Sequence, residues 1–183
     1  MTNEGQAHIA LVLGTARKGR KSHRVSRALE HALKEHGYRV TLIDVADHLI
    51  ARTIDSRDDA PETDEWREVA RAADCFVWVV PEYNHSFPGE FKVLIDSAPK
   101  EVYRRKPIGL VSVSDGGFGG ARLTEVLRSL ASVLGATPVS RVLNVSHVSE
   151  TFGEEGEVFD EMYQGRIVDM ITDIDWYIAH MRS

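Results

Sequence analysis

Cysteine is almost absent from this chain. A single residue, Cys75, occurs among 183, which excludes both an internal disulfide framework and a cysteine-rich zinc site. Cys75 begins an apolar run, and this position predicts a buried structural thiol rather than a nucleophile. The eight histidines are scattered without HExxH or another metal-ligand spacing, so no metal site is predicted.

Long hydrophobic runs and an excess of basic charge are also missing. No segment is long and apolar enough to span a membrane, and the opening residues MTNEGQAH lack the apolar part of a signal peptide. The 22 Lys and Arg residues against 28 Asp and Glu give a formal net charge of −6, which disfavours phosphate-rich polymers as partners. We therefore expect a soluble, cytoplasmic protein that binds neither nucleic acid nor membrane.

What the chain does contain is a regular alternation of apolar runs and helical patterns. Its length suits a single domain, residues 1–183, with a full hydrophobic core. Strands are predicted at residues 8–14, 39–45, 75–80, 108–113 and 138–145, and helical patterns at about 25–36, 61–69, 88–97, 123–134 and 159–182. Strict alternation predicts a parallel sheet with helices on both faces, joined by right-handed crossovers.

The loop after the first predicted strand has the chemistry of a phosphate site. It reads GTARKGRKS, residues 14–22, and leads directly into a helix. In parallel sheets, ligands bind beyond the carboxyl ends of the strands, where the strand order reverses. Hydroxyls, arginine and the free N–H groups at a helix start all favour a bound anion. The predicted phosphate ligands are Thr15, Arg17, Ser22 and His23.

Two other interpretations of this loop stay open. A P-loop, G-x-x-x-x-G-K-[ST], would make the protein a phosphotransferase. This segment is one residue too long, which displaces the lysine and the Mg²⁺-binding hydroxyl, and Asp44 is the one acidic residue placed to assist a metal. Alternatively, the loop is a solvated basic turn in which Ser22 caps the helix.

Two more loops follow the third and fourth predicted strands. Residues 81–89, PEYNHSFPG, form a stiff turn with backbone donors beside Tyr83, which suits a flat heterocycle with carbonyl oxygens. Residues 114–122, SDGGFGGAR, hold four glycines in five positions and allow close approach of a ligand to the backbone. Arg122 takes the third glycine position of G-x-G-x-x-G, so a Rossmann fingerprint is not supported. The predicted ring contacts are Pro81, Glu82, Tyr83 and Asn84 on one side, and Ser114, Gly116 and Gly117 on the other.

These segments resemble the NADPH-dependent FMN reductase family, a flavodoxin-like group that includes soluble quinone, azo-dye and chromate reductases. Residues 81–96, PEYNHSFPGEFKVLID, are similar to the pattern P-E-Y-N-x-S-x-P-G-x-L-K-N-x-I-D, and residues 116–136 to G-G-x-x-G-G followed by a helix ending in Leu-Gly-Ala. The first loop is similar to G-S-x-R-x-x-S, and the resemblance extends over about residues 9–145. Val93 replaces the usual asparagine, and Ser97-Ala98-Pro99 replaces a tryptophan-containing continuation.

The resemblance implies an α/β flavodoxin-like three-layer sandwich, with a five-stranded parallel sheet of order 2-1-3-4-5 between two helical layers. It implies non-covalent FMN and NAD(P)H as co-substrate, with electrons passing through FMN to a quinone, flavin or similar small acceptor by a ping-pong scheme. Because FMN carries the hydride transfer, no catalytic side chain is expected. The family also implies a homodimer, which can pair into a homotetramer. The alternative is a flavodoxin-type electron carrier without NAD(P)H turnover, although the T-x-T-G-x-T loop of flavodoxins is not matched.

Overall fold

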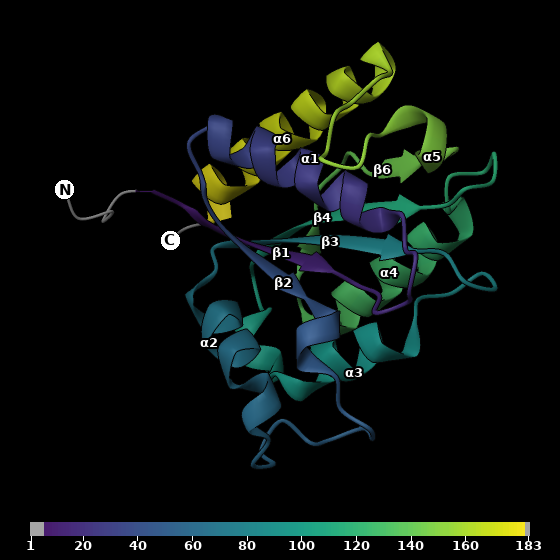
Figure 1. Ribbon diagram of the computed structural model, residues 1–183. Coiled ribbons are helices and arrows are strands. Elements are labelled where there is room, and N and C mark those ends of the chain that lie inside the picture. Colours follow the sequence, from purple (N-terminus) through teal and green to yellow (C-terminus); the bar gives the residue numbers. More distant parts are fainter. Residues whose placement is uncertain (1–5, 182–183) are drawn as a thin grey trace.

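A parallel β-sheet forms the middle layer of the molecule (Figure 1). The computed structural model describes residues 6–181. The strand order is β2-β1-β3-β4-β5, every pairing is parallel, and β6 also pairs with β4. The predicted sheet and its order are therefore confirmed. The strands are β1 His8–Leu13, β2 Arg39–Asp44, β3 Cys75–Pro81, β4 Pro107–Val113, β5 Thr137–Pro138 and β6 Leu143–Val145.

Helices cover both faces of the sheet, as predicted (Figure 1). One layer contains α1 Ser22–Glu35, α5 Val148–Thr151 and α6 Glu161–Met181, and the other contains α2 Asp64–Ala72, α3 Gly89–Ser97 and α4 Ala121–Leu134. The described residues also form three short 3-10 helices, η1 Val45–His48 after β2, η2 Pro61–Thr63 before α2 and η3 Lys100–Val102 after α3. The predicted end of the last helix, residue 182, lies outside the described residues.

Strand β3 shows why the sheet is buried on both faces. Phe76 and Trp78 point into the core under α2, α3 and α4, while Cys75 and Val77 point into the core under α1 and α6. All seven residues of the strand are buried, as expected for a continuously apolar central strand in a parallel sheet. Cys75 is fully buried, and this burial raises the pKa of its thiol. The prediction of a structural cysteine is confirmed.

The fifth strand differs from its prediction at residues 138–145, because it is broken into β5 and β6. Pro138 pairs with Ile108, whereas Leu143 pairs with Val111, so the chain bulges out of the sheet between the two pairs. Arg141 lies in this bulge, and its backbone N–H donates to Asp173 of α6 at 2.8 Å instead of to a strand. Proline also lacks the N–H that a continuous strand would need.

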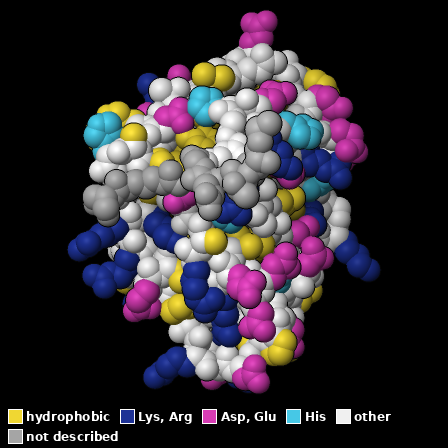
Figure 2. Space-filling view, turned by 90° about the vertical axis from the view of Figure 1, so that its left-hand side faces the viewer, with side chains coloured by type: hydrophobic (Ala, Val, Ile, Leu, Met, Phe, Trp, Pro, Cys, Tyr) yellow, Lys and Arg dark blue, Asp and Glu magenta, His cyan; other side chains and the backbone are white. Residues whose placement is uncertain are grey.

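The amino and carboxyl ends of the strands lie at opposite sides of the molecule (Figure 1). Figure 2 shows the amino-end face, where Lys and Arg side chains are interspersed with Asp and Glu side chains over its lower half. The carboxyl ends carry the three loops singled out above, after β1, β3 and β4 (Figure 1). Among the described helices, none is long and apolar enough to cross a membrane.

Candidate functional site

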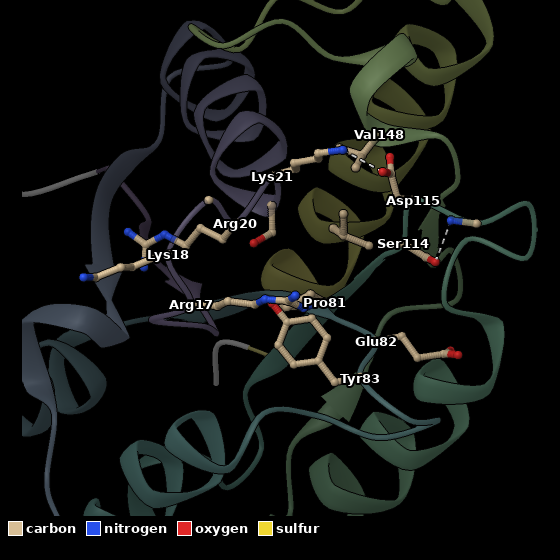
Figure 3. A pocket seen from close by; sticks show the side chains of 14 residues that line it. Arg17, Lys18, Arg20, Lys21, Pro81, Glu82, Tyr83, Ser114, Asp115 and Val148 are labelled. Carbon is tan, nitrogen blue, oxygen red and sulfur yellow. Dashed lines mark hydrogen bonds and ion pairs between the residues drawn. The ribbon is translucent and has the colours of Figure 1, made fainter.

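The three predicted loops meet around one cavity of about 440 Å³ (Figure 3). Its walls are residues 17–22 after β1, residues 81–83 at the end of β3 and just beyond it, and residues 113–116 at the end of β4, together with Val148 of α5. Strands β1 and β3 are neighbours although β2 lies between them in the chain, so the cavity sits where the strand order reverses. Its volume is in the range of small-molecule sites.

Ser22 brings a buried hydroxyl to this cavity. It is the first residue of α1 and only 2% exposed, and its Oγ has no hydrogen-bond partner within residues 6–181. The interpretation of Ser22 as helix cap is wrong, because Lys21 takes the cap position and no side chain caps the helix. The first N–H groups of a helix lack intrahelical acceptors. A buried, unpaired hydroxyl beside them is suited to an anionic ligand such as a phosphate.

Thr15 is placed differently from Ser22, although both were predicted to hold phosphate. Thr15 is fully buried and does not line the cavity. Its Oγ1 lies 3.1 Å from Glu90 Oε1 and 3.4 Å from the Tyr83 hydroxyl, and it accepts the Arg17 N–H at 3.3 Å. This hydroxyl is engaged inside the protein, behind the loop.

The first loop and the start of α1 carry a basic cluster of five residues, Arg17, Lys18, Arg20, Lys21 and Arg24. Most of them form ion pairs with carboxylates of the same chain. Arg20 forms a two-pronged ion pair with Asp44 and also donates to the Thr15 carbonyl. The pair occupies Asp44, the residue that a P-loop interpretation would offer to Mg²⁺. Lys21 Nζ reaches Asp115 Oδ2 at 2.6 Å, across the cavity (Figure 3). In the described part of the chain, no group of three His, Cys, Asp or Glu side chains could hold a metal ion.

Arg17 and Lys18 are the exceptions in this cluster. Neither forms an ion pair with another described residue, and both are exposed at the cavity. The Arg17 guanidinium lies 5.2 Å from the centre of the Tyr83 ring, a cation–π contact that fixes its direction (Figure 3). Arg17 therefore presents an unpaired positive charge at the cavity wall, where a phosphate would need it.

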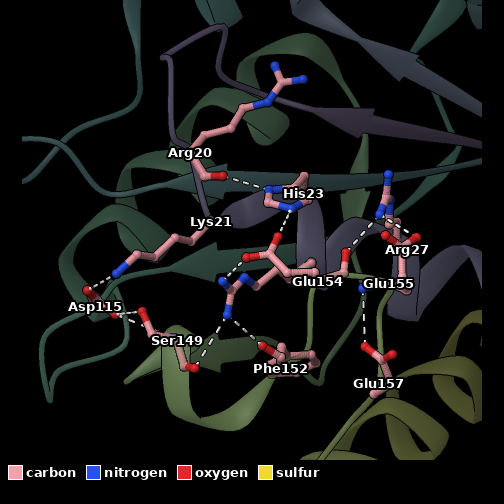
Figure 4. Close-up of polar contacts among 11 residues, drawn as sticks. Arg20, Lys21, His23, Arg27, Asp115, Ser149, Phe152, Glu154, Glu155 and Glu157 are labelled. Carbon is pink, nitrogen blue, oxygen red and sulfur yellow. Dashed lines mark hydrogen bonds and ion pairs between the residues drawn. The ribbon is translucent and has the colours of Figure 1, made fainter.

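His23 does not line the cavity. Its Nδ1 lies 2.6 Å from the Arg20 carbonyl and its Nε2 lies 2.8 Å from Glu154, which also pairs with Arg24 (Figure 4). The hydrogen bond from His23 is the main reason that the pKa of the Glu154 carboxyl is lowered. The structure thus places His23 in a network that ties α1 to the loop before α6, and its predicted phosphate contact stays a prediction.

The loop after β3 contributes one wall of the cavity and also holds the start of α4. Pro81, Glu82 and Tyr83 line the cavity. The Glu82 carboxylate accepts the backbone N–H of Leu123 at 3.1 Å, so it also satisfies the start of α4. Tyr83 and Ser86 exchange backbone hydrogen bonds of 2.9 and 3.0 Å around a tight turn. Asn84 is exposed in this turn with φ near +50° and does not line the cavity.

The glycine-rich loop after β4 divides into two parts. Ser114 and Gly116 line the cavity, and the Ser114 hydroxyl accepts the Gly116 N–H at 3.0 Å. Gly117 is exposed just outside the lining residues. Asp115, which sequence reasoning did not single out, accepts from both Lys21 and Ser149, and these hydrogen bonds lower the pKa of its carboxyl to about 2. Val148 was also missed, because it follows β6 in a helix of four residues.

Comparison with known sequences supports the resemblance. The profile described as NADPH-dependent FMN reductase matches residues 7–150. An NAD(P)H-dependent FMN reductase of Pseudomonas aeruginosa is 28% identical over 127 residues, 67% of this chain and 69% of that protein. A quinone reductase of Pseudomonas putida is 32% identical over 125 residues, 66% of this chain and 67% of that protein.

Solved structures support the flavodoxin-like fold. The flavoenzyme NAD(P)H:(acceptor) oxidoreductase FerB of Paracoccus denitrificans superposes with a TM-score of 0.81 at 23% identity, covering 95% of this chain and 98% of that one. A flavodoxin variant of Pseudomonas aeruginosa superposes with a TM-score of 0.64 at 15% identity, covering 92% and 99%. With the profile spanning most of its length, the chain belongs to the NADPH-dependent FMN reductase family.

Proposed function

We propose that this chain binds FMN non-covalently in the cavity at the ends of β1, β3 and β4 and is an NAD(P)H-dependent reductase of a small acceptor. The observation that carries the proposal is Ser22, which lines the cavity at the strand-order reversal and whose buried hydroxyl, at the start of α1, has no hydrogen-bond partner among the described residues. Family membership supports the choice of FMN among phosphate-bearing ligands.

In this proposal the FMN phosphate lies at the start of α1. Ser22 donates its hydroxyl to the phosphate, the first N–H groups of the helix add further donors, and Arg17 supplies the opposite charge. Thr15 acts from behind by holding the Arg17 backbone. A phosphate at this position would give an acceptor to a Ser22 hydroxyl that has none within residues 6–181.

Tyr83 and the turn that starts at Ser114 would hold the flavin ring between them. Pro81 and Glu82 border the same wall, and Gly116 allows the ring edge to approach the backbone. When bound, FMN supplies the redox chemistry by accepting a hydride from NAD(P)H and passing electrons to the acceptor. The protein binds, orients and shields the reacting groups, and it needs no general base for that task.

We further propose that the two substrates use the open face of the ring in turn, as a ping-pong scheme requires, and that the acceptor is a quinone, a flavin or a similar small molecule. Quinone reductases among the relatives support this acceptor class. We also propose that the working form is a homodimer, as the family resemblance implies, and that the protein is cytoplasmic.

The test is the visible spectrum of the purified protein with and without added FMN, followed by NADPH. Yellow protein that bleaches on addition of NADPH and recovers with a quinone is the expected result. Yellow protein that does not bleach would favour the electron-carrier alternative, and protein that cannot bind FMN would rule out both.

Parallel lines in double-reciprocal plots of initial rate at several quinone concentrations are expected for the ping-pong scheme, whereas intersecting lines would contradict it.

A further inference from the structure

We infer that Glu90, a residue outside the cavity, is a positioning residue that sets the phosphate loop in its ligand-binding conformation. The inference rests on the proposed FMN site. Glu90 is the second residue of α3, 75 positions along the chain from Thr15, and it falls at a variable position of the family pattern in residues 81–96. Neither the pattern nor the cavity lining points to it.

The carboxylate of Glu90 holds two consecutive residues of the loop after β1. Its Oε1 accepts the Ala16 backbone N–H at 3.0 Å and lies 3.1 Å from the Thr15 hydroxyl oxygen. Thr15 is fully buried and Glu90 is half-buried, so both contacts are shielded from much of the solvent. Hydrogen bonds to a charged acceptor of this kind are stronger than those between neutral groups.

The Thr15 hydroxyl has one hydrogen, and this limits the further hydrogen bonds that it can form. A hydroxyl has a single hydrogen to donate, and Glu90, having no hydrogen of its own as a carboxylate, must receive it. The oxygen of Thr15 is left as an acceptor for the Arg17 N–H and for the Tyr83 hydroxyl, which lies 3.4 Å away. By taking the hydrogen of the Thr15 hydroxyl, Glu90 leaves the oxygen of that hydroxyl to accept from Arg17 and Tyr83 rather than to contact a ligand in the cavity.

This arrangement places Arg17 where the phosphate needs it. Arg17 is held at its backbone by Thr15 and at its guanidinium by the ring of Tyr83. Without Glu90, the Thr15 hydroxyl can rotate and the Ala16 N–H loses its acceptor, so the backbone support of Arg17 loosens. The expected loss concerns phosphate recognition, while the ring contacts are kept.

The experiment compares FMN with riboflavin, which lacks the phosphate, by fluorescence titration of the flavin-free protein. Glu90→Ala is expected to weaken FMN binding about tenfold and riboflavin binding by less than about twofold. Glu90→Gln is expected to stay within about twofold of wild type for both ligands, because its side-chain oxygen can accept the same two hydrogen bonds. Thr15→Val, which removes the hydroxyl at nearly constant volume, is expected to reproduce Glu90→Ala.

Glu68→Ala, at an exposed glutamate of α2, is the control and is expected to bind both flavins like wild type. Equal losses for FMN and riboflavin in Glu90→Ala would mean a merely structural role and would overturn the inference. So would a Gln variant as weak as the Ala variant. Failure of the wild-type protein to bind either flavin is a different result, since it would overturn the proposed function itself.

Discussion

The two loops that face each other across the cavity are built on opposite principles. The loop after β1, residues 14–21, is held by side chains: Glu90 and Asp44 from other elements anchor it. The loop after β4, residues 114–120, can follow its path only because glycine, which has no Cβ, occupies its tightest positions. A Cβ on Gly120 would lie 2.8 Å from the Ser112 Cβ, and Gly120 has φ of +75°, a conformation that L-residues rarely adopt.

The contrast shows that one motif can contain two kinds of glycine. In the loop after β4, Gly119 and Gly120 are needed for packing, since a Cβ at Gly119 would lie 3.1 Å from the Asn144 backbone. Gly116 and Gly117 are exposed, and a Cβ there would meet no atom closer than 3.5 Å. The first pair maintains the fold, and the second pair leaves room for a ligand.

The largest expected effect therefore comes from Gly120→Ala. The clash and the left-handed backbone together should lower the free energy of unfolding by about 3 kcal/mol. Gly117→Ala, in the same loop, should change it by less than about 0.5 kcal/mol. Urea denaturation of both variants measures the difference. Equal stabilities for the two variants would contradict the division of the motif.

The next largest effect is expected from Arg17→Ala, on the side-chain-held loop. Loss of a charge-assisted contact worth about 1.5–3 kcal/mol should weaken FMN binding about ten- to hundredfold, with no change in unfolding. Riboflavin titration separates loss of the phosphate contact from general damage to the site. Arg71→Ala, at an exposed arginine of α2, removes the same charge elsewhere and should bind FMN normally. Unaltered FMN retention in the Arg17 variant would show that the phosphate assignment is wrong.

A smaller and more discriminating effect is expected at two buried serines of α1. Ser22 has an unpaired hydroxyl, whereas the Ser26 hydroxyl donates to the His23 carbonyl at 2.9 Å. Ser22→Ala should weaken FMN binding about fivefold without lowering stability, because the free protein loses no hydrogen bond. Ser26→Ala should lower stability by about 1 kcal/mol and leave FMN binding unchanged. Thermal unfolding and FMN titration measure the stability and the FMN affinity of both variants. Weaker FMN binding in Ser26→Ala and lower stability in Ser22→Ala would place the phosphate elsewhere.

The fold could be predicted because its signals are local. The continuous apolar run of β3 and the helical spacing of Val25, Leu29 and Leu33 each predict an element without knowledge of its neighbours. The bulge before β6 could not be predicted, because it depends on Arg141 meeting Asp173 of α6. Helix α5 was missed because four residues are too short to show a helical period.

The candidate site could be located from the sequence, but the roles of its individual residues could not be predicted. Thr15 and Ser22 both looked like phosphate ligands, and only burial and partners separate them: Glu90 takes the Thr15 hydroxyl, and no described residue takes that of Ser22. In the sequence, the basic residues of the first loop also cannot be told apart as phosphate ligands. The structure separates them, because some pair with carboxylates that are distant in the chain, as Lys21 does with Asp115. Pairings of this kind are set by the topology of the sheet.

The smallest predicted effect concerns an ion pair that joins the two loops, Lys21 with Asp115. Hydrogen bonds from Lys21 and Ser149 lower the pKa of Asp115 from 3.8 to about 2. A carboxyl whose pKa is lower in the folded state stabilises the fold above its unfolded pKa, and this contribution is lost as pH falls from about 4 toward 2. Because the Asp115 side chain is 55% exposed, screening should hold the effect below about 1 kcal/mol.

Asp115→Asn removes the titrating group and keeps the shape of the side chain. Thermal unfolding between pH 5 and pH 2 should therefore show a steeper loss of stability in wild type than in this variant, and 1 M salt should reduce the difference. Identical profiles would mean that the bridge adds nothing to the fold. The two loops would then be held in place separately, one by the Glu90 and Asp44 carboxylates and the other by its packed glycines.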